Sequence, residues 1–352
     1  MASSPRLEND RLKTRDPIPQ LTPLARPQYD VSVIIVSFNT RETLRDCLQS
    51  VRLESGNLQI EILVVDNSSS DGSPEMVEKD FPQASLIRAG SNLGFGAANN
   101  LALQQARGRY FVLLNSDAFL QPGALAASIR RMDEHPDCGL AGGRLTGRDG
   151  RMQPSGRSFP TLLDDVLVST GLASRFPKSR FFGRFDRTWA DELEPAEVDW
   201  VPGAFSIIRP QALLRTGLFN PVFFLYFEEV DLCRRMKRDG FTVWYWPDIS
   251  VVHVGGESSR QIDGLKVSSS GAQVVLWRMR STLLYYRMYH GWKVNLAKWL
   301  ELAIYAGSLA RNRFSRDPVR RQRSRSSRTL IHLMYQAWDD TQGGTISPPR
   351  PW

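Results

Sequence analysis

Apolar and polar residues follow two alternating patterns along the chain from residue 29 onwards. Runs too apolar to face water on either side are typical of strands buried inside a parallel sheet. Four such runs occur, at residues 31–37, 60–66, 84–88 and 110–117. Segments with apolar residues at helical spacing lie between or after them, at 40–51, 94–106 and 122–135. The alternation predicts an α/β fold with a doubly wound, mostly parallel sheet.

The pattern is looser after residue 139. Residues 148–196 combine aromatic residues, proline and glycine with weak periodicity, which predicts loops and short helices over the sheet. Further strands are expected at 199–210, 241–247 and 250–254, and helices at 211–217, 228–239, 267–289 and 292–310.

These patterns divide the chain into four parts. Residues 1–28 are rich in proline and charge, and we expect them to form a flexible arm. Residues 29–260 form the α/β domain, and residues 261–310 form a helical extension. The basic segment 311–352 is expected to be disordered.

The net charge of +8 is concentrated near the C-terminus of the 352-residue chain. Residues 311–328 contain eight arginines and one aspartate, which leaves 37 basic and 36 acidic residues for all other positions. The remainder is therefore nearly neutral, and its composition does not predict a nucleic-acid-binding face.

The composition also limits the class of protein. A hydrophobic share of 41% excludes a chain that is disordered throughout. No apolar run reaches the ~18 residues of a membrane span, and the N-terminus lacks the apolar core of a secretory signal. The three cysteines supply neither a disulfide framework nor a CxxC metal site. We therefore expect a reduced, cytosolic protein.

Polar residues follow all four predicted strands. They are Ser37-Phe38-Asn39, Asp66-Asn67-Ser68, the segment 91–96, and Asn115-Ser116-Asp117. Because ligands of open parallel sheets bind at the carboxyl ends of the strands, four polar ends indicate a cleft. Within it, Asp66 either accepts hydrogen bonds from a base edge or ribose, or caps its own turn.

Residue Asp117 follows an apolar strand and lies among small side chains. Such a carboxylate suits a divalent cation that bridges a diphosphate, because substrate phosphates fill the other ligand positions. The alternative is an N-cap for the helix that begins at Pro122, but four residues separate the two.

The glycines of residues 90–96 do not form a dinucleotide fingerprint. Their order is G-x-x-x-G-x-G, they follow the third strand, and no acid holds a ribose 20 residues on. No G-x-x-x-x-G-K-[ST] motif occurs either. We expect these glycines to let the backbone pass close to a bound nucleotide.

Three carboxylates begin the helix predicted at 228–239, namely Glu228, Glu229 and Asp231. They favour the helix dipole, which is one sufficient explanation. The preceding PVFFLYF is strongly aromatic, and an apolar wall raises a carboxylate pKa and makes a usable general base. His253 lies shortly before two glycines, a context that exposes an imidazole to a ligand. The alternative is a purely structural role for this histidine.

Seven segments in this order resemble glycosyltransferase family 2, inverting nucleotide-sugar enzymes of the GT-A fold, and especially its bacterial rhamnosyltransferase-like branch. They are VSVIIVSFN, EILVVDNSSSDGS, NLGFGAANN, YFVLLNSDA, DWVPGAFSIIRP, FFLYFEEVDLCRRMKRDGF and HVGGES. They span residues 31–258. The resemblance implies a nucleotide-binding half at 29–138 and an acceptor-binding half at 139–260.

The resemblance also implies roles for individual residues. The nucleotide contacts it implies are Ser37, Asn39, Asp66, Asn92, Gly94 and Asp117. Asp117 and His253 would hold a divalent metal, Mg²⁺ or Mn²⁺. Glu229 would be the catalytic base, and Glu228 and Asp231 beside it would be further catalytic residues. Trp200 and Gly203 would face the acceptor, although core packing is an equal alternative for Trp200.

Two departures from the family pattern matter. The metal motif reads Asn-Ser-Asp where many relatives have two aspartates, so Asn115 is a weak partner at most. The expected base is Glu229 where the family has aspartate, which keeps the chemistry but shifts its geometry. The alternatives to a transferase are a sugar-nucleotide pyrophosphorylase, although SFNTRET lacks the glycine-rich loop, and a non-catalytic protein that binds nucleotide or nucleic acid.

The resemblance implies specific partners. The expected donor is a nucleotide sugar, with dTDP-rhamnose as the leading choice, and the acceptor is a glycan or a polyprenyl-diphosphate-linked glycan of bacterial surface polysaccharide synthesis. No specific nucleic-acid partner is expected, and a homo-oligomer is left open. An apolar helix face around Trp292, Leu296 and Trp299, followed by the arginines of 311–328, predicts peripheral attachment to an anionic bilayer at the cytoplasmic face of the membrane. The alternative is a helix that packs on the catalytic domain or on a second subunit, followed by a solvated arginine tail.

Overall fold

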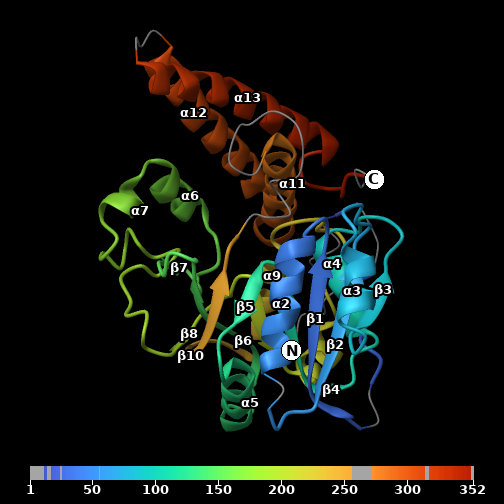
Figure 1. Cartoon of the computed structure of the whole chain (residues 1–352). Coiled ribbons are helices and arrows are strands. Elements are labelled where there is room, and N and C mark those ends of the chain that lie inside the picture. The colour runs from blue at the N-terminus through green and yellow to red at the C-terminus, as the bar shows by residue number, and fades with distance from the viewer. Residues whose placement is uncertain are drawn as a thin grey trace.

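The computed structural model describes residues 12–13, 17–23, 26–54, 56–255, 271–313 and 317–349. Four parallel strands form the first half of the sheet: β1 (Tyr29–Ser37), β2 (Ile60–Asp66), β3 (Ser85–Arg88) and β4 (Gly108–Asn115). The helices of this half are α2 (Arg41–Leu53), α3 (Ser73–Asp80) and α4 (Phe95–Leu103). Helices α2 and α4 begin within one residue of the predicted positions 40 and 94, whereas α3 was not predicted from the apolar periodicity (Figure 1).

The second half extends the same sheet and makes it mixed. Its strands are β5 (Ala118–Leu120), β6 (Cys138–Thr146), β7 (Met152–Gln153), β8 (Ala196–Glu197), β9 (Phe205–Ile208) and β10 (Thr242–His253). The main strand order is β3-β2-β1-β4-β9-β6-β10-β5, and β9 runs antiparallel to both of its neighbours. Its helices are α5 (Ala124–Glu134), α6 (Leu162–Ser169), α7 (Leu172–Arg175), α8 (Pro210–Thr216) and α9 (Glu228–Arg238).

The central strand β1 is buried on both faces of the sheet. Val31, Val33 and Ile35 belong to the core on the α2 side, whereas Ile34 belongs to the core that includes α4 and α9. All four are fully buried. This two-sided burial explains why the strand is a continuous apolar run instead of an alternating one.

The strand register brings the polar strand ends to one edge of the sheet. Ser37 at the end of β1 pairs with Asp66 at the end of β2, and Val36 pairs with Asn115 at the end of β4. A parallel register of this kind makes the loops after β1, β2, β3 and β4 neighbours.

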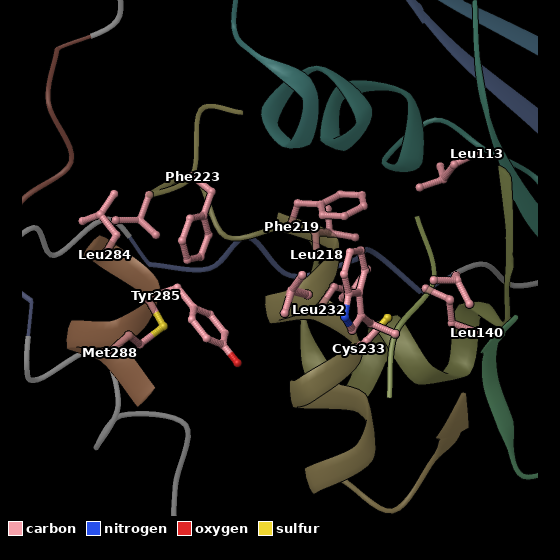
Figure 2. Packing of buried hydrophobic residues seen from close by; sticks show 14 of the residues in the cluster. Leu113, Leu140, Leu218, Phe219, Phe223, Leu232, Cys233, Leu284, Tyr285 and Met288 are labelled. Atoms are coloured by element: carbon pink, nitrogen blue, oxygen red, sulfur yellow. The ribbon is translucent and has the colours of Figure 1, made fainter. Parts of the chain in front are cut away.

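The C-terminal part is helical. It consists of α11 (Gly271–His290), a 3₁₀ turn (Gly291–Lys293), α12 (Val294–Asn312) and α13 (Pro318–Asp340). Helices α12 and α13 form a hairpin that projects away from the sheet, and α11 lies between this hairpin and the sheet domain (Figure 1). Figure 2 shows Leu284, Tyr285 and Met288 of α11 beside Phe223, in the same buried cluster as Leu232 of α9. Within the described ranges, no helix combines the length and apolar character needed to cross a bilayer.

Two expectations about the ends of the chain are corrected by the structure. The segment 318–340 is the helix α13, not a disordered tail, because Leu333, Met334 and Ala337 are buried against the other C-terminal helices. Part of the N-terminal arm is also fixed: Leu21 is buried, and the Leu218 N–H donates to the Pro19 carbonyl (2.8 Å). The expected boundary at 260/261 lies outside the described residues, as does HVGGES from its second glycine on.

Candidate active site

A hollow of about 360 Å³ lies at the edge where β1, β2 and β3 end. We call it the strand-end hollow, and its lining residues are Phe38, Asn39, Ser68, Ser70, Gly90, Ser91 and Asn92. Asn39 and Asn92 were both predicted to contact a nucleotide, and the fold brings them to one cavity from loops more than 50 residues apart in the sequence.

The walls of the strand-end hollow are held by side-chain to backbone hydrogen bonds. Asn39 has a positive φ of 52°, and its Oδ1 accepts from the Ser70 N–H (2.7 Å). The Ser69 N–H donates to both carboxylate oxygens of Asp66 (3.3 Å each). Asp66 therefore caps its own turn and is 6% exposed, which matches the structural alternative; a nucleotide contact for it remains a prediction.

The predicted nucleotide contact Ser37 is fully buried. Its hydroxyl lies 3.0 Å from that of Thr40, which donates to Ser116 Oγ (2.9 Å). This chain of hydroxyls joins the end of β1 to the loop that carries Asp117. The structure thus corrects the expected direct contact, because Ser37 supports the site from beneath it.

Asn67 organises the loop before α4, although the residue pattern alone gave it no role. Its Nδ2 donates to Asn92 Oδ1 (2.9 Å), and its Oδ1 accepts from the Leu93 N–H (2.8 Å). Asn92 Oδ1 also accepts from the Gly94 N–H (2.9 Å). Both asparagines are buried, so their amides are occupied in shaping the loop.

Gly94 joins the strand-end hollow to the segment before α9. Its φ is +80°, and a Cβ built there would lie 2.0 Å from the carbonyl oxygen of Phe224. The next residue, Phe95, donates its N–H to the same oxygen (3.0 Å). The close approach that this glycine permits in the structure is to Phe224; a nucleotide contact for it remains a prediction.

Residues Asp117 and His253 lie side by side, as the resemblance implied. The antiparallel pairing of β5 with β10 aligns Ala118 with His253, and the Val254 N–H donates to the Asp117 carbonyl (3.0 Å). The His253 Nε2 is 3.5 Å from Asp117 Oδ1. One carboxylate and one imidazole suit a divalent cation whose other ligands are phosphate oxygens and water. In the described part of the chain, no group of three or more acidic, histidine or cysteine side chains could hold a metal by itself.

The acid helix α9 begins after a strained turn. Tyr226 and Phe227 have φ values of 70° and 71°, a left-handed conformation that is uncommon for bulky residues and costs about 1–3 kcal/mol at each. Glu228 is buried and Glu229 is half-buried at the first positions of the helix. The Oε2 atoms of both glutamates are buried without a hydrogen-bond partner among the described residues.

Burial raises the pKa of both glutamates. For Glu228 the pKa is well above its usual range, because the neighbouring Glu229 charge adds to the desolvation. For Glu229 the Arg157 charge and the Gly203 N–H oppose the raised pKa. Of the pair, Glu229 has the greater support for a negative charge, and it is also the more exposed carboxyl.

The third carboxylate, Asp231, is engaged on both oxygens. It is fully buried, Arg235 Nε donates to its Oδ2 (2.9 Å), and Tyr289 Oη donates to its Oδ1 (2.5 Å). The guanidinium of Arg235 also donates to the Leu218 carbonyl (2.8 Å). These contacts assign Asp231 to fixing α9 against α11 and the preceding loop, away from the direct chemical role that was expected for it.

The two predicted acceptor residues lie in different environments. Trp200 is 6% exposed, its Nε1 donates to the Ser158 carbonyl (2.9 Å), and the Arg157 guanidinium lies over its ring (5.2 Å). This burial corrects the expected sugar platform and supports core packing. Gly203 adjoins the acid pair, since a Cβ built there would lie 4.0 Å from Glu229 Oε1.

Sequence reasoning missed Arg157 because nothing in its local pattern points to α9. Its charge acts on Glu229 of the acid helix. Its position is set by a β-bridge to Trp200 and by an ion pair with Asp186 (Nε–Oδ1 3.1 Å). By contrast, Asn67 belongs to the polar end of the second predicted strand, and this position could have identified it as a residue of the site.

Comparison with known proteins agrees with this geometry. The sequence model described as Glycosyl transferase family 2 matches residues 32–189, which include the strand-end hollow and Asp117. An N-acetylglucosaminyl-diphospho-decaprenol L-rhamnosyltransferase of Mycobacterium tuberculosis is 27% identical over 234 residues, which cover 63% of this chain and 75% of that protein. Rhamnosyltransferase WbbL of Escherichia coli K12 is 23% identical over 266 residues, 72% of this chain and 92% of that protein.

Among solved structures, a mannosyltransferase of Pyrobaculum calidifontis in complex with GDP-Man and Mn²⁺ aligns with 96% of this chain and 81% of its own, at 18% identity and a TM-score of 0.44. The expected α/β fold with a C-terminal helical region is confirmed by the structure of the chain itself, although the sheet is mixed instead of mostly parallel. The family match and the two rhamnosyltransferases carry the assignment: residues 32–189 form a glycosyl transferase family 2 domain, and the protein is a glycosyltransferase.

Proposed function

We propose that this enzyme moves rhamnose from dTDP-rhamnose, with inversion at the anomeric carbon, to a hydroxyl of a polyprenyl-diphosphate-linked glycan. The observation that carries the proposal is the packing of α4, which begins just after the wall of the strand-end hollow formed by residues 90–92, against the start of α9: a Cβ built at Gly96 would lie 3.4 Å from Glu228 Cβ. A donor nucleotide bound in that hollow would present its sugar towards Glu229. The names of the two rhamnosyltransferase relatives support the choice of sugar and of a lipid-linked acceptor.

In this proposal Glu229 is the general base. Its side chain is half-buried and its Oε2 has no hydrogen-bond partner among the described residues, so the carboxylate has room to take the proton of an acceptor hydroxyl. The Gly203 N–H and the charge of Arg157 stabilise the ionised form that a base requires. Glu228, whose pKa is raised further, would stay protonated and avoid a second negative charge beside it.

Asp117 and His253 would hold a divalent cation, Mg²⁺ or Mn²⁺, together with the donor diphosphate. When bound, such a cation offsets the negative charge that develops on the departing nucleoside diphosphate. Asp66, Asn39 and Asn92 would border the nucleoside, in the hollow whose shape their hydrogen bonds maintain.

A donor panel tests the proposed function. The full chain is mixed with dTDP-rhamnose, UDP-sugars or GDP-mannose, and thermal stabilisation and transfer to polyprenyl-diphospho-N-acetylglucosamine are measured. We expect dTDP-rhamnose to stabilise the protein most and to be consumed only with acceptor present. Transfer from a different donor would refute rhamnose, and synthesis of a nucleotide sugar from a triphosphate and a sugar phosphate would indicate the pyrophosphorylase alternative.

We also propose that the α12–α13 hairpin attaches the enzyme to an anionic bilayer. Trp292, Leu296 and Trp299 lie at helical spacing and are 65%, 45% and 60% exposed, although they are large apolar residues. The exposed arginines of α13 include Arg320, Arg321, Arg323 and Arg325. Aromatic residues suit the membrane interface, and each basic residue near an anionic surface contributes about 1 kcal/mol.

Point variants test this attachment better than deletion, because removing α13 would expose the apolar residues of α11 and α12 that pack against it. We expect the double variant Trp292→Ser/Trp299→Ser to lose sedimentation with phosphatidylglycerol vesicles, whereas Leu53→Ser should not. Leu53 is the matched control, since it is 76% exposed but lies on α2 in the sheet domain. Equal sedimentation of both variants, or none by the natural chain at low salt, would refute the attachment.

A further inference from the structure

The side chain of Gln153 contacts His253 at two places. Gln153 lies on the short strand β7, which pairs with β6 through Leu145, and β6 in turn pairs with β10. Its Nε2 donates to the His253 backbone carbonyl (2.8 Å), and its Oε1 lies 2.8 Å from His253 Nδ1. One side-chain amide therefore forms hydrogen bonds with both the backbone and the ring of the same histidine.

These two contacts fix which ring nitrogen carries the proton. A backbone carbonyl can only accept, so the Gln153 amide must present its N–H₂ group to it. The amide oxygen then faces Nδ1, and because this oxygen also only accepts, Nδ1 must be the donor. In the neutral imidazole Nε2 is left with a lone pair, 3.5 Å from Asp117 Oδ1.

We infer that Gln153 is a positioning residue that holds His253 as the Nδ1–H tautomer, with the Nε2 lone pair directed at the cation site. This inference rests on the cation proposed above. Without Gln153, the neutral ring would favour the opposite tautomer, because an Nε2–H could donate to the Asp117 carboxylate. That tautomer cannot ligate a cation through Nε2, and outer partners of this kind are known to orient metal-ligating histidines.

The tautomer of His253 is measurable in the metal-free protein. Long-range ¹H–¹⁵N correlation spectra of ¹⁵N-histidine-labelled full chain at pH 8, with the His253→Gln variant for assignment, should show the proton on Nδ1. In Gln153→Met, which keeps the length but removes both amide groups, the proton should move to Nε2. In Gln153→Glu, which keeps an acceptor for Nδ1–H, it should stay. Met152→Leu is the matched control, since Met152 is the neighbouring β7 residue but lines a separate hollow with Tyr245.

Metal affinity gives the second measurement. Mn²⁺ binding in the presence of dTDP, followed by electron paramagnetic resonance, should weaken about 10–100-fold in Gln153→Met and much less in Gln153→Glu. The inference would be overturned if the natural chain held the Nε2–H tautomer, or if the tautomer did not change in Gln153→Met. If instead the tautomer follows residue 153 but Asp117→Ala leaves Mn²⁺ binding unchanged, the proposed cation site has failed, and with it the inferred purpose of the tautomer.

Discussion

The two sides of the cleft satisfy their polar groups in opposite ways. On the strand-end side, the amide groups of Asn39, Asn67 and Asn92 form hydrogen bonds within and between neighbouring loops. On the acid-helix side, Glu228 and Glu229 keep buried oxygens that have no partner within the described residues, behind two aromatic residues with left-handed backbone. The hydrogen bonds of the first side fix its shape, whereas the second side retains backbone strain and two carboxyl oxygens without a hydrogen-bond partner among the described residues.

The difference indicates where binding and reactivity reside. A fully hydrogen-bonded loop cluster is rigid and can recognise a ligand without rearrangement. Buried carboxyl groups with raised pKa and a strained approach are typical of reacting groups, and the surrounding structure must supply the stability that they cost. Part of this stability comes from the hydrogen bonds of Asp231 with Arg235 and Tyr289, in the same helix as the glutamates.

The largest effect is expected from removing the base. Glu229→Gln should lower turnover by about 10²–10⁴-fold, because the amide cannot take the acceptor proton. Nucleotide affinity, measured by calorimetry, should not change, since Glu229 lies on the other side of the cleft. Glu228→Gln is the paired control, and a larger loss of turnover there would show that the wrong carboxylate has been chosen.

A substitution at Gly94 should disturb the contact between the loop before α4 and the Phe224 carbonyl, which lies in the segment before α9. In Gly94→Ala the new methyl group overlaps the Phe224 carbonyl in a left-handed residue, so we expect destabilisation of about 2–4 kcal/mol with weaker nucleotide binding and slower turnover. Gly90→Ala is matched, because its φ is +75° but nothing lies within 4 Å of a Cβ there. It should cost only about 1–2 kcal/mol. Equal unfolding free energies for the two variants would contradict a role for this contact.

A further carboxyl group with a raised pKa is that of Asp165 on α6. Burial raises the pKa of Asp165 to about 6, against an ordinary 3.8, while the Tyr286 hydroxyl that donates to it opposes the shift. The folded protein therefore holds this proton more tightly than the unfolded chain. The resulting stability is complete below the unfolded pKa and is lost as the pH rises through about 6.

Replacing this carboxyl should flatten the pH dependence of stability. Between pH 4 and 7 the natural chain should lose on the order of 2 kcal/mol relative to Asp165→Asn, measured by urea unfolding at several pH values. Asp149→Asn, at an exposed loop position, provides the comparison. A constant difference between the natural chain and Asp165→Asn across this range would disprove the raised pKa.

The smallest effect should come from the support beneath α9. Tyr289→Phe removes one hydrogen bond to Asp231 and should cost about 1 kcal/mol of stability, with a modest loss of turnover and unchanged nucleotide affinity. Tyr305→Phe loses a comparable bond to Glu301 on α12, distant from the acid helix along the chain. If both variants lowered turnover equally, Asp231 would have no special part in positioning the glutamates.

The sequence by itself determined the first half of the sheet, the polar strand ends and the start of the acid helix. These features are local: an apolar run is buried on both faces of a sheet, and a parallel register then brings strand ends to one edge whatever the rest of the chain does. Asn39, Asp66 and Asp117 were placed correctly at that edge for this reason. The match of residues 32–189 to the family covers this same locally encoded part.

Only the tertiary structure decided which of these residues face the cleft. Ser37 and Trp200 carry suitable chemistry but are buried, and Asp231 is paired by Tyr289 from 58 residues further on. The contact of Gln153 with His253 spans 100 residues and depends on the register of three strands. Helix α13 folds despite its many arginines because α11 and α12 bury its few apolar residues. Exposure and pairing depend on what packs against a side chain, and local sequence does not contain that information.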